Sequence, residues 1–221
     1  MMNSLFSSFD PLTCSKTQIN WMSSFIILGL LPCCYWLLGG RIFNMMQIST
    51  NWLNLELKSN MKSKFMGSLL VMTSFFLFIF LNNILGLFPY IFTSSSHMLF
   101  SLTLSFPLWL SYMLFGWLNM SKKMFSHLVP EGTPLLITPL VVMIETVSIS
   151  IRPSVLALRL SANLMVGHSL MSLLGNNLLG SSSYIQVLMI FSQSLIMLFE
   201  MFVAVLQAFV FSMLISLYYE E

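Results

Sequence analysis

The sequence predicts an all-α polytopic membrane protein that forms a single membrane domain over residues 1–221. Of these residues, 57% are hydrophobic and only 7% are charged, whereas soluble domains contain about 25% charged residues. Several apolar runs reach about 18 residues or more, the length that a helix needs to cross a bilayer. We therefore expect about five membrane-crossing helices and one interfacial amphipathic helix, with the last two crossing helices forming a long, strongly tilted hairpin.

The amino-terminal segment, 1–20, leads into the first expected span, 21–38, which is broken only by Pro32. No charged leader or cleavage site precedes this run, so we interpret it as a retained helix and not as a targeting segment. The net charge of +2 is small, and the charged residues are scattered along the chain. This pattern does not favour a nucleic-acid partner. Membrane lipid is the environment that the composition indicates.

Neither a cofactor nor a metal site is expected. The three cysteines have no CxxC spacing and are interpreted as ordinary hydrophobic residues; they are Cys14, Cys33 and Cys34. The three histidines lie on separate segments, which disfavours the paired axial ligands of a cytochrome. The sequence also lacks the GxxxxGK[ST] phosphate-binding loop, so the chain is not expected to act as an enzyme on its own.

Basic residues indicate how the first half of the chain crosses the membrane. The stretch 41–64 mixes tryptophan and leucine with lysines, a pattern typical of a helix that lies at the interface. Two spans, 66–88 and 99–117, follow as a hairpin, and Lys122 and Lys123 come directly after it. By the positive-inside rule, both basic segments belong on one side of the membrane, and the amino terminus then lies on the other.

The carboxy-terminal hairpin is too long for upright helices. Its two limbs, 135–174 and 184–219, would measure about 60 and about 54 Å at 1.5 Å per residue, against a hydrocarbon core of about 30 Å. Each limb must therefore either tilt strongly or break, and Pro139 and Pro153 are the candidate kink sites. We favour tilt combined with a kink.

Polar residues recur at every seventh position in both limbs, which places them along one face of each helix. In the first limb they are Thr138, Glu145, Arg152 and Arg159, with Asn163 four residues further on the same face. In the second limb they are Gln186, Gln193, Glu200 and Gln207.

Packing explains the amides better than it explains the charges. An interhelical hydrogen bond contributes about 0.6 to 2 kcal/mol, enough to account for the glutamines as structural. An arginine or aspartate at the bilayer centre costs about 2.5 to 3.5 kcal/mol. Glu145 and Arg152 could neutralise each other as a structural pair. Arg159 has no acid on its face nearer than Glu145, so we expect it to face a carboxylate of another chain or a water-filled cavity.

Five motifs resemble the family of subunit a of the mitochondrial F-type ATP synthase, animal type. They are 82–90 (NNILGLFPY), 128–134 (LVPEGTP), 144–148 (IETVS), 151–153 (IRP) and 158–168 (LRLSANLMVGH). The resemblance covers about residues 65–219 in order. It departs from the family pattern at Glu131, where many animal members have Gln, and at Val166, where Ala is usual.

The resemblance implies a proton-conducting stator subunit in the Fo sector, which couples proton flow to rotation. Its partners would be the c-ring, whose subunits each carry a mid-membrane carboxyl, the other Fo membrane and stator subunits, and lipid. Arg159 would face the ring carboxylate as the essential charge and block direct proton passage between two half-channels. It would do so because a guanidinium group stays charged at any accessible pH.

The same resemblance assigns a proton path. His168 and Glu200 would belong to the inlet half-channel on the intermembrane side, and Glu145 to the exit toward the matrix. Asn163 and Gln207 would be uncharged hydrogen-bonding partners near the arginine, while Arg152 would be structural.

The location implied is the mitochondrial inner membrane, with the amino terminus on the intermembrane side and the carboxy terminus in the matrix. The alternatives are a subunit of a respiratory proton pump and a structural membrane anchor. A pump of the antiporter type would carry lysines inside its spans, and all six lysines lie outside the expected ones. An anchor would leave Arg159 unexplained.

Overall fold

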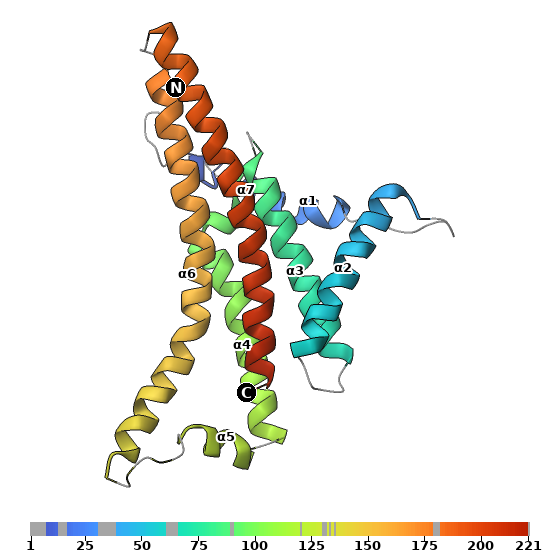
Figure 1. The fold of residues 1–221 in the computed structure, drawn as a ribbon, viewed down its shortest axis with the longest axis vertical. Coiled ribbons are helices and arrows are strands. Elements are labelled where there is room, and N and C mark those ends of the chain that lie inside the picture. The colour runs from blue at the N-terminus through green and yellow to red at the C-terminus, as the bar shows by residue number, and fades with distance from the viewer. Residues whose placement is uncertain are drawn as a thin grey trace.

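The computed structural model describes residues 8–12, 17–30, 39–60, 66–88, 91–119, 121–129, 132, 134, 136–178 and 182–220. In these residues every regular element is a helix, which confirms the all-α fold (Figure 1). The α-helices are α1 (Ser23–Leu30), α2 (Arg41–Asn60), α3 (Met66–Leu87), α4 (Met98–Asn119), α5 (Ser121–His127), α6 (Thr138–Leu178) and α7 (Ser183–Glu220). The short 3-10 helices η2 (Ile19–Met22) and η3 (Ser94–Ser96) lie before α1 and between α3 and α4.

Within the described residues, four helices are long and apolar enough to cross a membrane. These segments are Gly67–Leu87, Met98–Asn119, Thr138–Leu178 and Ser183–Leu214. The expected first span, 21–38, begins in η2 and continues through α1, but its second half, 31–38, lies outside the described residues. The five-crossing arrangement therefore stays a prediction.

The α6–α7 hairpin is the longest feature of the molecule. Its helices have 41 and 38 residues, run side by side, and extend at their closed end beyond the other helices (Figure 1). The predicted loop at 175–183 begins one turn too early, because α6 continues through Leu178. The side-chain amide of Gln186 in α7 donates to the Leu178 carbonyl at 3.4 Å, and so satisfies a carbonyl that the end of α6 would leave unpaired.

Only one of the two candidate prolines lies in the interior of α6. Pro139 is the second residue of the helix, where the backbone N–H would be unpaired in any case. Pro153 is buried in the interior, where it leaves the Ile149 carbonyl without its usual N–H partner. The first part of α6, in yellow, leans away from α7 while the rest runs beside it (Figure 1).

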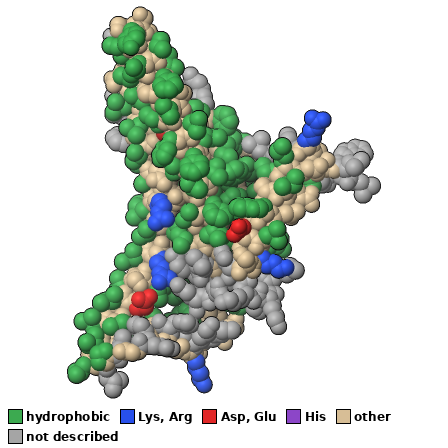
Figure 2. All heavy atoms as spheres, in the orientation of Figure 1, with side chains coloured by type: hydrophobic (Ala, Val, Ile, Leu, Met, Phe, Trp, Pro, Cys, Tyr) green, Lys and Arg blue, Asp and Glu red, His purple; other side chains and the backbone are tan. Residues whose placement is uncertain are grey.

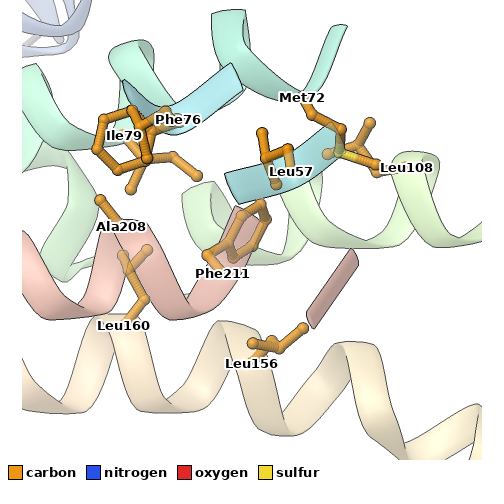
Figure 3. Packing of buried hydrophobic residues seen from close by; sticks show 10 residues of the cluster. Leu57, Met72, Phe76, Ile79, Leu108, Leu156, Leu160, Ala208 and Phe211 are labelled. Carbon is orange, nitrogen blue, oxygen red and sulfur yellow. The ribbon is translucent and has the colours of Figure 1, made fainter. Parts of the chain in front are cut away.

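The core of the bundle fixes how α6 is rotated. Leu156 and Leu160 of α6 lie in one cluster of buried side chains with Phe211 of α7 (Figure 3). The cluster is completed by Met72, Phe76 and Ile79 of α3, Leu108 of α4, Ala208 of α7, and Leu53 and Leu57 of α2. Leu156 and Leu160 point into this cluster. Of the two residues about 100° around the helix from Leu160, Ser161 is buried and Arg159 is exposed.

Small side chains allow the long helices to approach each other. Ala157 and Gly167 of α6 are buried, as are Ala204 and Ala208 of α7. Membrane helices associate by close packing, since lipid offers little hydrophobic driving force, and small residues let their backbones come together. These positions hold α6 against its neighbours over the part of the chain that carries the polar residues.

The outer surface is mainly hydrophobic and carries few charged side chains on the face seen in Figure 2. On α7, Val187, Phe191 and Leu198 are among the exposed apolar residues. Helix α2 buries Leu53 and Leu57 but exposes Met45 and Ile48. Such a surface suits lipid contact; the interfacial placement of 41–64 and the tilt of the long hairpin stay predictions.

Candidate functional site

A cavity of about 390 Å³ lies between α6 and α7 and reaches α3. Most of its lining is aliphatic, but four polar side chains from three helices also line it: Asn83, Asn163, Glu200 and Gln207. Three of these are residues predicted from the sequence. The polar faces of the two long helices therefore meet at one place over this stretch.

The polar groups of the cavity are only partly satisfied by protein. The Asn163 amide donates to the Gln207 side-chain carbonyl at 3.5 Å, and the Asn83 amide donates to the Ala204 backbone carbonyl at 3.4 Å. Three further atoms of the lining, Asn83 Oδ1, Gln207 Nε2 and Glu200 Oε1, are buried without a hydrogen-bond partner in the described structure. Buried polar atoms of this kind are normally paired with ordered water, so the cavity has the chemistry of a hydrated site.

Gly167 makes room for the Glu200 carboxyl group. A Cβ atom added at Gly167 would overlap the carboxylate oxygen and carbon of Glu200. Any larger residue at this position must therefore displace the carboxyl group, because a side chain on α6 and the carboxylate from α7 cannot share the same space. The absence of a side chain at Gly167 decides where this carboxylate lies.

His168 lies beside the cavity but does not line it. Its imidazole is hydrogen-bonded to the backbone of Gly86 near the end of α3 and meets the Phe9 ring edge-on, with centroids 6.4 Å apart. Its Nε2 atom is buried and has no partner in the described structure. The histidine thus connects α6 to α3 and keeps one nitrogen available for water.

Arg159 points out of the bundle. Val155, Arg159, Ala162 and Val166 follow one another at helical spacing on α6 and are all exposed. No hydrogen bond or ion pair of Arg159 is formed with any residue that the structure describes. Ala162 and Asn163, one turn further along, line the cavity. A cation without a partner among the described residues therefore lies on the exposed face of α6 that also carries Val155, Ala162 and Val166, one turn from residues of the cavity lining.

Glu145 is separate from this group. Its carboxylate lies 3.7 Å from the Arg152 guanidinium, and both side chains are partly exposed. Along α6, Glu145 is about 21 Å from Arg159 at 1.5 Å per residue. The structure therefore brings Asn163, Glu200 and Gln207 together near Arg159, and leaves Glu145 paired with Arg152 at a distance.

Sequence reasoning missed two members of the site. Asn83 belongs to the 82–90 motif (NNILGLFPY), but only the fold places it in the cavity with residues of α6 and α7. Gly167 belongs to a recognised motif, yet its role depends on Glu200, which is 33 positions away. A polar residue inside an apolar span was the available signal for Asn83; no local signal existed for Gly167.

Comparisons with known proteins identify the family of this chain. The profile of the ATP synthase A chain family matches residues 18–220. Three similar proteins are named ATP synthase subunit a: those of Locusta migratoria (44% identity), Aedes aegypti (46%) and Drosophila melanogaster (43%), each aligned over 100% of this chain and 99% of its own length. The family expected from the sequence motifs is confirmed, and the chain belongs to the ATP synthase A chain family.

Proposed function

We propose that this chain is the proton-translocating stator subunit of the Fo sector of a mitochondrial F-type ATP synthase. It works within the complex, couples proton flow to rotation, and makes no ATP by itself. The observation that carries the proposal is Arg159, a cation on an exposed face of α6, one turn from a cavity. Within the described residues, Arg159 has no partner, and three buried polar atoms of the cavity have none. The name shared by its relatives supports a place in that complex.

Arg159 faces the c-ring and meets its membrane carboxylates one after another. Two opposite charges about 4 Å apart attract by about 4 kcal/mol at an effective dielectric constant of about 20. That attraction keeps a passing carboxylate ionised, so it gives up its proton before it reaches the arginine. The small and apolar neighbours of Arg159, Val155 and Ala162, favour the close approach of another helix.

The cavity is the inner part of the inlet half-channel. Glu200 and His168 each have a buried atom available for water, and both can exchange protons. Asn163 and Gln207, which bond to each other at 3.5 Å, hold water between Glu200 and Arg159. Protons from the intermembrane side reach the ring through these groups.

Glu145 belongs to the exit half-channel, which opens to the matrix. Its separation from Arg159 of about 21 Å along α6 is too long for direct transfer. A proton therefore passes from the inlet to the exit only on the ring, and Arg159 blocks the direct route by charge repulsion. Replacing Arg159 tests this function: proton-driven ATP synthesis is expected to stop and passive proton leak to rise. An assembled complex that still makes ATP at the parent rate would exclude the proposal.

The chain is a multi-pass inner-membrane protein, with its amino terminus on the intermembrane side and its carboxy terminus in the matrix. Lys58 in α2 and Lys122 in α5 are both exposed, and α3 and α4 lie between them in the chain. Single cysteines at Lys58 and Lys122 are therefore expected to react with a membrane-impermeant maleimide from the matrix side only. Labelling of the two positions from opposite sides would contradict this topology.

The second arginine of α6 is expected to matter much less than the first. The Arg152 guanidinium lies 3.7 Å from the Glu145 carboxylate, so its charge is balanced within the chain. Arg152→Gln is therefore expected to slow ATP synthesis less than Arg159→Ala does and to leave passive proton leak unchanged. The measurement is ATP synthesis and leak in the same vesicles. Complete loss of synthesis in an assembled Arg152→Gln complex would move the essential charge to Arg152.

A further inference from the structure

A second group of buried polar side chains lies outside the cavity, in the turn between α3 and α4. Thr93, Ser94, Ser95 and Ser96 are all buried, and this turn packs against α3, α4 and α6. Four consecutive hydroxyl groups buried among apolar helices need partners, because an unsatisfied buried hydroxyl group is costly. The proposed function makes no use of this turn so far.

Three of the four hydroxyl groups are satisfied by the protein. The Ser96 hydroxyl donates to the Thr93 backbone carbonyl at 2.7 Å and lies 2.9 Å from the Thr93 hydroxyl. The Ser94 hydroxyl donates to the side-chain oxygen of Asn82 at 3.3 Å. The Asn82 amide in turn donates to the Phe78 carbonyl in α3 at 3.0 Å. These bonds fix the shape of the turn.

Two atoms of the turn are left over. Ser95 is only 1% exposed, and its hydroxyl oxygen has no partner in the described structure. The Nε2 atom of His97 is also buried and has no partner among the described residues. Its ring packs against those of Trp21 and Phe92, with centroids 5.2 Å from each. Two polar atoms, only two residues apart, therefore lack partners in the described part of the chain, and water can serve both.

The turn connects directly with the site already described. Thr93 packs on Gly86, since a Cβ added at Gly86 would lie 3.3 Å from the Thr93 methyl group. The backbone of Gly86 is hydrogen-bonded to His168. Asn82, which holds Ser94, is the neighbour of Asn83 in the cavity lining. The turn thus packs against the residue that holds His168 and bonds to the neighbour of the cavity residue Asn83.

We propose that Ser95 and His97 hold the water of the outer segment of the proton inlet, through which protons reach His168 and Glu200. This inference rests on the proposed function. In each transfer a hydronium ion gives one proton to the next water, and the last water gives it to the His168 or Glu200 side chain. Each donor is left as neutral water, so no other reactant is needed.

A structural role predicts a different result for Ser95→Ala. Removing a buried hydroxyl that has no protein partner costs no protein hydrogen bond, so a purely structural Ser95 would leave assembly and proton flux unchanged. If Ser95 holds inlet water, the variant assembles but its rate of proton-driven ATP synthesis falls several-fold. Passive leak stays low, because Arg159 is intact. Flux equal to that of the parent chain would overturn the proposal.

Silver ion gives a direct test of water at this position. A soft, hydrated cation binds thiolate and reaches a buried thiol only through water. Ser95→Cys is made in a chain whose three cysteines are replaced by serine, and silver nitrate is added to the intermembrane face of mitoplasts. The matched control is Ser212→Cys: Ser212 is also 1% exposed, but its hydroxyl bonds to the Phe209 carbonyl at 2.8 Å.

Silver is expected to stop ATP synthesis in the Ser95→Cys complex. It is expected to leave ATP synthesis unchanged in the Ser212→Cys complex and in the cysteine-free background. Membrane potential is measured in parallel. No inhibition at Ser95, or equal inhibition at Ser212, would overturn the proposal. The proposed function is tested separately, without silver: if ATP synthesis is lost in the Arg159→Ala variant, the proposed function holds. The silver result then tests the inlet alone. If Ser95→Cys does not assemble, the flux of Ser95→Ala decides.

Discussion

Arg159→Ala is expected to abolish proton-driven ATP synthesis and to raise passive proton leak through the membrane sector. The loss is of one charge that has no partner in the described chain, so the packing of α6, which Leu156 and Leu160 provide, is kept. The attraction removed is about 4 kcal/mol, which corresponds to a factor of about a thousand in the ionisation of a passing carboxylate. Assembly is measured by native electrophoresis, and leak by the decay of a proton gradient.

Arg159→Lys is the informative companion, because it keeps a positive charge at neutral pH in water. An ammonium group lacks the guanidinium fork and can lose its proton when it is desolvated, whereas a guanidinium group does not. The lysine variant is therefore expected to retain little ATP synthesis. Parent-level synthesis in an assembled Arg159→Ala complex would show that another residue carries the charge.

Gly167→Ala is expected to slow proton uptake strongly without preventing assembly. The added Cβ would overlap the Glu200 carboxyl group, and the flexible end of that side chain can move aside at low cost in packing. A positioned proton-transfer group that is displaced by about 1 Å can lose about a hundredfold in rate, so we expect a loss on the order of tenfold or more in proton-driven ATP synthesis. Leak should stay at the parent level, since Arg159 remains.

The matched control for this variant is on the same helix. A Cβ added at Gly175 would meet nothing within 4 Å, so Gly175→Ala makes the same chemical change without moving a carboxylate. Glu200→Gln keeps the shape of the side chain and removes its proton-binding group, and should also slow uptake without leak. Equal rates for Gly167→Ala and Gly175→Ala would mean that the position of the Glu200 carboxylate is unimportant.

The hairpin illustrates what can be predicted from local sequence. Its limbs were expected at 135–174 and 184–219, and helices are found at Thr138–Leu178 and Ser183–Glu220. Helix type and length follow from apolar run length and from spacing, which are properties of neighbouring residues. The sequence predicts that the first limb ends at residue 174, whereas α6 ends one turn later, at Leu178. The Leu178 carbonyl accepts a hydrogen bond from the Gln186 amide of the facing helix, a contact that local spacing does not reveal.

The polar seams show the limit of the same reasoning. Spacing by seven places Glu200 and Gln207 on one face of the second limb, and in the structure both line one cavity with Asn163. The spacing also allows the Glu145–Arg152 pair, whose charged groups lie 3.7 Å apart. It could not say which seam residues would face each other and which would face outward. That choice depends on the rotation of α6, which buried contacts with α4 and α7 decide.

The amino-acid sequence by itself determined the class of the protein, the long hairpin and the presence of a membrane-embedded arginine without a nearby acid on its face. Only the tertiary structure decided that Arg159 points outward while Glu200 lies in the space left by Gly167. It also decided that Asn83 of α3 joins Gln207 of α7 in one cavity. The physical reason is that helix formation is local, whereas a cavity and its unpaired polar atoms arise only where side chains distant in sequence pack against one another.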